Sequence, residues 1–252
     1  MLTNPWIIPS ELQFLHPNSG TIAASFNVSK RRPGTRCCAS MRVDQPVNAS
    51  RVKICGITSL EDAQVAVNAG ADAIGLVFYA SSPRAISIAQ AREIAAAVGP
   101  FVTVVGLFVD AEEAYVREVL ANVALHVLQF HGNETRNYCE SFQRPYLKAI
   151  RMRSDADVQQ AMVEYPSAAA ILLDAYRPGV PGGTGETFDW QRVPAQSVRP
   201  IVLAGGLTPE NVAQAIKVTQ VYGVDVSGGV ESQPGKKNAQ KIEQFIHNAR
   251  HA

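Results

Sequence analysis

A cysteine and an aspartate in this sequence each close a short apolar run, the position at which parallel strands present reactive side chains. Cys55 lies in the run 52–56, and Asp174 ends the run 170–174. A thiolate can accept a proton, and a carboxyl group partly removed from water can donate one. The two residues could therefore supply a general base and a general acid. Each also has a structural alternative: Cys55 as a small buried hydrophobe, and Asp174 as a cap for the loop after it.

Two strand-to-glycine turns near the C-terminal end of the chain predict a site for an anion. Their residues are Gly205 and Gly206 in the first turn, and Ser227, Gly228 and Gly229 in the second. Glycine leaves backbone N–H groups uncovered, and the dipole of a helix behind the turn favours an anion, most often a phosphate. We expect the first helix to have Thr208 as N-cap and Pro209 at its first position. Tight turning alone would explain either glycine pair, but two such turns on successive strands favour a phosphate site.

Further polar residues at or just after expected strand ends could bind a substrate: Arg84, Gln129, His131 and Asp225. Arg84 could clamp a carboxylate through two hydrogen bonds, although an ordinary surface arginine fits as well. His131 could act in catalysis, as a helix cap or as a hydrogen-bond partner. The segment 177–190 contains four glycines, among them Gly183, and two prolines. It predicts a long loop that serves as a lid or as a wall of the pocket.

Strand and helix signals alternate from Arg51 onward. We expect eight strands, over residues 52–56, 73–78, 103–109, 125–130, 146–151, 170–174 and 201–203, and the eighth within 224–230, where it runs into the second glycine turn. A helix signal follows each run, and eight such units in about 200 residues predict a single α/β domain, a (β/α)8 TIM barrel over residues 51–252. A doubly wound open sheet is the alternative, but no Gly-x-Gly-x-x-Gly turn follows the first strand. In a barrel the active site lies at the C-terminal ends of the strands, where the residues above are found.

Residues 1–50 differ from the rest and are predicted to form a disordered extension. They contain five basic and only two acidic residues, many Asn, Pro and Ser, and no lasting helix or strand period. An organellar targeting segment would explain this composition and would place the protein in a plastid. The favoured explanation is upstream sequence before a translation start at Met41, since the stretch contains no amphipathic Arg-rich helix.

The composition argues against several classes of protein. A net charge of +1 over 252 residues gives no electrostatic case for a nucleic-acid or membrane partner. No apolar run approaches the roughly 20 residues of a spanning helix. The four cysteines, Cys37, Cys38, Cys55 and Cys139, form no Cys-x-x-Cys pair. This pattern argues against a zinc site and against a disulfide framework. It favours a reducing compartment, which we expect to be the cytoplasm.

Several motifs together resemble the phosphoribosylanthranilate isomerase family of tryptophan biosynthesis. They are Lys53-Ile-Cys-Gly-Ile-Thr58, Ser82-Pro-Arg84, Gly106-Leu-Phe-Val109, Gln129-Phe-His-Gly132, Leu173-Asp174, Gly182-Gly-Thr-Gly185 with Phe188-Asp-Trp190, Ala204-Gly-Gly-Leu207 and Asp225-Val-Ser-Gly-Gly-Val-Glu231. The resemblance runs without a large gap from Arg51 to Arg250. The first motif combined with Gly-Gly-Thr-Gly is specific. Two departures are minor: many members carry a second serine in place of Gly228, and leucine in place of Phe130.

The resemblance implies an Amadori rearrangement of a phosphorylated aminoaldose, with Cys55 as general base and Asp174 as general acid. It implies that Arg84 holds the anthranilate carboxylate and that the two glycine turns hold the phosphate. Gln129, His131, Gly183 and Asp225 are expected to line the same site. No metal, nicotinamide or flavin cofactor is expected, because the amine of the substrate itself acts as electron sink.

Three further expectations concern partners and alternatives. The ligand is a small phosphorylated molecule, and the chain is expected to be a monomer or homodimer without nucleic-acid or membrane partners. The related histidine-pathway aminoaldose isomerase, or an enzyme that accepts both substrates, is one alternative. Cys55 argues against the former, since that family uses an aspartate at the first strand. The alternative of another class is a non-catalytic barrel that binds a phosphosugar.

Overall fold

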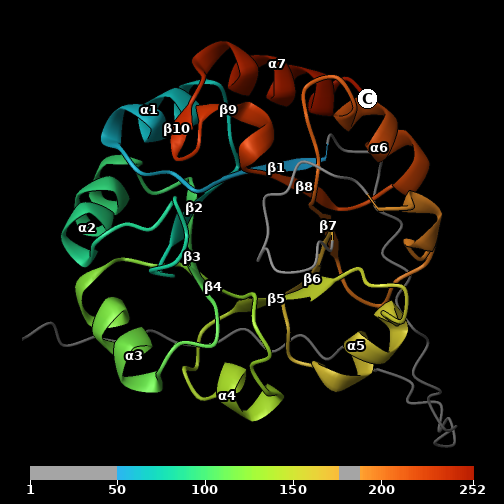
Figure 1. The fold of residues 1–252 in the computed structure, drawn as a ribbon, viewed down its shortest axis with the longest axis horizontal. Helices are drawn as coiled ribbons and strands as arrows, with labels where there is room; N and C mark the ends of the chain where they lie inside the picture. Colours follow the sequence, from blue (N-terminus) through green and yellow to red (C-terminus); the bar gives the residue numbers. More distant parts are fainter. Residues whose placement is uncertain (1–49, 176–187) are drawn as a thin grey trace, which may run out of the picture. The chain divides into compact units, whose positions relative to one another are not determined.

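The computed structural model describes residues 50–175 and 188–252. The predictions for residues 1–49, including a start at Met41, and for Gly183 lie outside these residues. Within them the predicted barrel is confirmed, because eight parallel strands pair in chain order and the last pairs with the first. Figure 1 looks down the barrel, with the strands in the middle and the helices in a ring around them.

The barrel strands are close to the predicted runs. They are β1 (Arg51–Cys55), β2 (Ala73–Val77), β3 (Thr103–Phe108), β4 (Val127–Phe130), β5 (Tyr146–Arg151), β6 (Ala170–Asp174), β7 (Ile201–Leu203) and β8 (Gly223–Val226). They are largely apolar because a parallel strand in a closed barrel is covered on both faces. In β1, Val52 and Ile54 belong to the large core that the helices share, whereas Cys55 packs with Val77 and Leu107 in a separate cluster.

Seven α-helices and two 3-10 helices lie in the described part of the chain. They are α1 (Leu60–Asn68), α2 (Ile88–Ala97), α3 (Glu113–Asn122), α4 (Arg136–Glu140), α5 (Val158–Glu164), η1 (Trp190–Arg192), α6 (Val212–Thr219), η2 (Gly228–Val230) and α7 (Ala239–Arg250). The N-cap of α1 is Ser59, whose hydroxyl accepts from Asp62 N–H. The carboxylate of Asp62 does not return the bond in a capping box but accepts from Lys237 N–H. None of these helices is both long and apolar enough to cross a membrane.

The helix after β7 begins later than predicted. The N-cap position of α6 is Asn211, so the prediction of Thr208 as N-cap with Pro209 at the first helical position is wrong. The Asn211 amide accepts from Thr208 N–H and donates to Gly206 O, which stabilises a turn where the helix was expected to start. The helix that starts directly at a glycine turn is the short η2, and β8 ends at Val226, where it runs into the second glycine turn as predicted.

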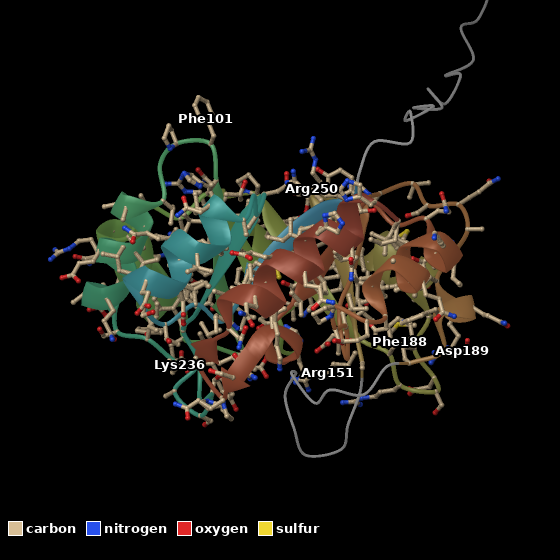
Figure 2. All side chains as sticks on the ribbon, turned by 90° about the horizontal axis from the view of Figure 1, so that it is seen from above. Phe101, Arg151, Phe188, Asp189, Lys236 and Arg250 are labelled. Carbon is tan, nitrogen blue, oxygen red and sulfur yellow. The ribbon has the colours of Figure 1, made fainter. Side chains whose placement is uncertain are left out.

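A small antiparallel hairpin between η2 and α7 was not predicted. Its strands are β9 (Glu231–Gln233) and β10 (Lys236–Lys237), and the hydroxyl of Thr58 donates to Gly235 O at its turn. In Figure 2, Lys236 of the hairpin and Arg151 at the end of β5 lie toward one end of the barrel, and Phe101 lies at the other. The hairpin therefore lies at the C-terminal ends of the strands, where a barrel carries its active site.

Candidate active site

A cavity opens among the C-terminal ends of the strands. Predicted site residues that line it are Cys55, Arg84, Gln129, His131, Asp174, Gly205, Gly206, Asp225, Ser227, Gly228 and Gly229. Val77, Leu107 and Tyr79 contribute apolar wall, which lowers the local dielectric constant and strengthens electrostatic interactions inside. Within the described ranges, no group of three or more His, Cys, Asp and Glu side chains could hold a metal ion.

Cys55 is the last residue of β1, and it shares a face of that strand with Lys53 because side chains alternate along a strand. The Lys53 ammonium pairs with Asp225 Oδ1 at 2.9 Å, and both side chains are buried. Burial raises the pKa of the Cys55 thiol; Lys53 opposes this effect and Asp225 adds to it. The thiol packs against Val77 and Leu107 and also lines the cavity.

Asp174 ends β6 and belongs to a buried hydrogen-bond chain. Asp174 Oδ2 lies 3.0 Å from His131 Nε2, and His131 Nδ1 lies 3.1 Å from Gln129 Nε2. The amide nitrogen of Gln129 can only donate, so Nδ1 accepts and a neutral ring carries its proton on Nε2. His131 then donates to Oδ2, which leaves Oδ1 as the oxygen of Asp174 that can hold a transferable proton.

Arg84, in the loop after β2, forms a bidentate pair with Glu231. Its Nε and Nη2 each donate to a carboxylate oxygen at 2.8 Å, and Lys237 Nζ donates to Oε1 at 2.9 Å. Burial tends to raise the pKa of Glu231, but the hydrogen bonds from Arg84 and Lys237 outweigh it and hold this pKa below its ordinary value. Arg84 is therefore held in a charged cluster at the cavity and is not an ordinary surface arginine.

The glycine turns after β7 and β8 lie against neighbouring backbone. Gly205 has a φ of 83°, and a side chain there would collide with Ala175 N. A side chain at Gly229 would collide with Leu207 O, so the two turns touch. Only glycine fits at either position, and both line the cavity. A ligand that reaches this end of the cavity meets backbone instead of side chains, as in known phosphate sites.

The family of this chain is shown by a match over most of its length. Residues 52–248 match the model for N-(5'-phosphoribosyl)anthranilate (PRA) isomerase. This chain belongs to the phosphoribosylanthranilate isomerase family. The family predicted from the motifs is therefore confirmed, as is the enzyme class, an isomerase that carries out an aldose–ketose Amadori rearrangement in tryptophan biosynthesis. The alternative of a non-catalytic barrel finds no support.

Individual phosphoribosylanthranilate isomerases are similar to this chain over almost their whole length. The enzyme of Cellvibrio japonicus is 71% identical over 195 residues, which are 77% of this chain and 91% of that protein. The crystal structure from Thermotoga maritima is 44% identical with a TM-score of 0.74, and the alignment covers 81% of this chain and 100% of that one. A structure in complex with reduced 1-(o-carboxyphenylamino)-1-deoxyribulose 5-phosphate is 40% identical, with a TM-score of 0.69 and coverage of 81% and 100%.

The oligomeric state of this chain, a monomer or a homodimer, stays a prediction. Another solved structure, 40% identical with a TM-score of 0.71, contains monomers generated from the dimeric Thermotoga maritima isomerase. A monomer and a homodimer are thus both represented among similar barrels of the family.

Sequence reasoning missed three charged residues that surround the site. Lys53 contacts Asp225, and Glu231 and Lys237 form the cluster with Arg84. Lys53 had a usable signal: it lies two residues before Cys55 and must share its face of the strand. Glu231 belongs to a recognised motif, but the sequence did not indicate which residue it contacts. Lys237 had no local signal, because its position depends on the hairpin.

Proposed function

We propose that this family member converts N-(5'-phosphoribosyl)anthranilate into 1-(2-carboxyphenylamino)-1-deoxyribulose 5-phosphate, with Asp174 as general acid and Cys55 as general base. The observation that carries the proposal is one cavity lined by a thiol from β1, a carboxyl group from β6 and two glycine turns. The strands β1 and β6 are separated by β7 and β8 in the closed barrel, so acid and base approach the ligand from different sides. The bound molecule of the solved relative has the same carbon skeleton as the proposed product.

The cavity offers a separate partner for each part of the substrate. The phosphate is assigned to the two glycine turns. Their backbone N–H groups favour an anion even where no basic side chain contacts it. The anthranilate carboxylate is assigned to Arg84, whose orientation Glu231 fixes. Gln129 Oε1 is buried and has no hydrogen-bond partner among the described residues, so it can accept from a hydroxyl or amine hydrogen of the substrate.

The first step opens the ribose ring. Asp174 transfers a proton to the ring oxygen, the bond from C1′ to that oxygen breaks, and the nitrogen lone pair forms a C1′=N iminium. Oδ1 is the oxygen assigned to this transfer because Oδ2 accepts from His131.

The second step moves a proton away from C2′. The Cys55 thiolate removes it, the C–H electron pair forms a C1′=C2′ double bond, and the iminium electrons return to nitrogen. The resulting enolamine becomes the ketone when its 2′-hydroxyl loses a proton and C1′ gains one. The substrate is oxidised at C2′ and reduced at C1′, so atoms and electrons balance within one molecule.

Two isosteric substitutions test the assignment. We expect Cys55→Ser and Asp174→Asn each to lower kcat by about 10³-fold, since each removes a group that transfers a proton. Turnover is followed by the loss of substrate fluorescence. Binding of a reduced product analogue, measured by calorimetry, should persist in both variants because phosphate and carboxylate contacts remain.

Cys139→Ser is the matched control, because Cys139 is also buried but lies in α4, away from the cavity lining. It should retain the parent rate. A near-normal rate in either active-site variant would remove that residue from the chemistry. Assay of the histidine-pathway aminoaldose with the parent protein tests the alternative of dual substrate use.

A further inference from the structure

A buried ion pair lies beside the proposed general base. Lys53 Nζ and Asp225 Oδ1 are 2.9 Å apart, and their side chains are only 6% and 8% exposed. A buried ion pair can often be replaced by apolar residues without loss of stability, because desolvation cancels most of the attraction. Barrel stability alone is therefore a weak reason for a lysine and an aspartate here, and the position next to Cys55 suggests a chemical one.

Strand β2 makes the space in which the ammonium and the thiol come together. Gly75 pairs with Cys55 across the sheet, and a Cβ atom added at Gly75 would lie 2.6 Å from Cys55 Sγ and 3.0 Å from Lys53 Nζ. Any residue other than glycine would push these two atoms away. Cys55 and Asp225 line the cavity, so this cluster of polar atoms borders the place where substrate is proposed to bind.

We propose that Lys53, held by Asp225, is a positioning residue that supplies the counter-charge for the thiolate of Cys55. The proposal rests on the proposed role of Cys55 as general base. The charged groups that face the thiol come from four elements: Lys53 of β1, Asp225 of β8, Lys237 of β10 and Arg84 of the loop after β2.

Lys53 is the cation with the largest influence among them. Arg84 and Lys237 share their charge with Glu231, whereas the partner of Lys53 is Asp225. Burial opposes the charge of Lys53, yet Asp225 and Cys55 together raise the pKa of its ammonium. Lys53 therefore stays positively charged over the pH range in which a thiol ionises.

The two members of the ion pair act on the thiol in opposite directions. Lys53 lowers the pKa of Cys55 and Asp225 raises it, against a background of burial that raises it further. Loss of Lys53 must therefore raise the pH at which the thiolate forms, and loss of Asp225 must lower that pH. A purely structural ion pair predicts instead that both losses destabilise the fold without opposite effects on the thiol.

The experiment measures the pH dependence of alkylation by iodoacetamide in the full chain. Mass spectrometry of the Cys55 peptide separates this thiol from the other cysteines. Lys53→Met should move the midpoint up by about 1–3 pH units and Asp225→Asn should move it down, as expected for charges at this distance. The acid limb of kcat/KM should move in the same two directions. The Lys53→Met/Asp225→Asn double variant should fall between the single variants.

Two comparisons keep the result specific. Lys148→Met removes an equally buried lysine, which pairs with Glu134 at 2.9 Å, and should leave the Cys55 midpoint unchanged. Cys139 serves as internal control for Lys53→Met and Asp225→Asn, since burial raises the pKa of its thiol to about 12 and neither of these two variants removes a charge that acts on it. Should Lys53→Met fail to fold, the double variant is compared with Asp225→Asn. The difference between their midpoints measures the effect of the Lys53 charge when the charge of Asp225 is absent from both proteins.

Midpoints that move in the same direction, or that stay fixed in folded Lys53→Met and Asp225→Asn proteins, would overturn the role of Lys53. Thermal unfolding followed by circular dichroism shows that the variants are folded. The outcome is separate from the test of the catalytic base. An active Cys55→Ser enzyme would refute the base while the alkylation shifts still stood.

Discussion

The two groups proposed to transfer protons have different kinds of partner. Cys55 is faced by charged side chains, foremost the ion pair of Lys53 and Asp225. Asp174 is hydrogen-bonded to His131, which is bonded in turn to Gln129, and Arg151 donates to the backbone carbonyl of His131. A base that must ionise within a buried site benefits from a nearby cation, whereas a hydrogen bond to one oxygen of an acid orients its other oxygen. The comparison teaches that one cavity can surround its two proposed proton-transfer groups with different partners, an ion pair for the thiol and a hydrogen-bond chain for the carboxyl group.

Among substitutions of the groups that surround the acid and the base, a charge added beside Asp174 should have the largest effect. In Gln129→Glu the new carboxylate can only accept, so His131 must place a proton on Nδ1, and a neutral ring then no longer donates from Nε2 to Asp174. The variant also adds a negative charge beside the proposed acid, so kcat at neutral pH should fall on the order of 10²-fold, as measured by initial rates.

Gln129→Met is the control for that experiment, since it removes the amide but adds no charge. It should lower the rate less. Equal losses in the two variants would show that the charge and the hydrogen-bond direction at position 129 are unimportant.

Removal of the hydrogen bond from His131 should have the next largest effect. His131→Leu deletes the donor to Asp174 Oδ2, and a hydrogen bond to a carboxylate contributes about 1.5–3 kcal/mol. We expect kcat to fall on the order of 20-fold with little change in KM. His131→Gln keeps an N–H donor near the position of Nε2 and should recover most of the rate. A failure of glutamine to outperform leucine would argue that His131 merely fills space.

Loosening of Arg84 should affect binding more than turnover. Glu231→Gln removes the charge that orients the guanidinium, and we expect KM to rise about fivefold with kcat nearly unchanged, a loss of about 1 kcal/mol. Steady-state kinetics separate the two parameters. Lys236→Met, on the exposed part of the same hairpin, is the matched control and should leave KM alone (Figure 2). A fall in kcat without a rise in KM would assign Glu231 a different role.

The smallest effect should come from the opposite end of the barrel. Arg51 pairs with Asp72 at 2.9 Å, but the arginine side chain is 60% exposed. Because water screens such a pair, Arg51→Ala should lower the free energy of unfolding by less than about 1 kcal/mol and leave the pH profile unchanged. Urea denaturation and the kcat/KM profile check this. A shifted profile would show that charges far from the cavity also tune the thiol.

Much of the fold could be predicted because its signals are local. The strands β5, β6 and β7 were placed with the bounds that the structure shows; in β6 and β7, burial on both faces leaves a nearly continuous hydrophobic run. The prediction for the start of α6 was wrong, and the cause is also local. The side-chain amide of Asn211 hydrogen-bonds to the backbone of Gly206 and Thr208, so the turn continues to Asn211 and the helix does not start at Thr208.

The residues of the site were named from strand ends, but their partners were not. Arg84 and Glu231 are 147 positions apart, and His131 and Asp174 are 43 apart. No pattern along the sequence predicts that Arg84 and Glu231 form two parallel hydrogen bonds. Nor does any pattern predict that His131 and Asp174 complete a buried hydrogen-bond chain. Such contacts follow from which strands and loops the barrel brings together.

The sequence by itself determined the number of βα units, the family and the side chains at the strand ends, because hydrophobic period and turn chemistry are properties of neighbouring residues. Only the tertiary structure decided which charges face the thiol. Lys53 meets Asp225 across 172 residues because closure of the barrel pairs β1 with β8. The strength of an electrostatic interaction depends on distance and burial in space, and neither quantity is written in the order of the residues.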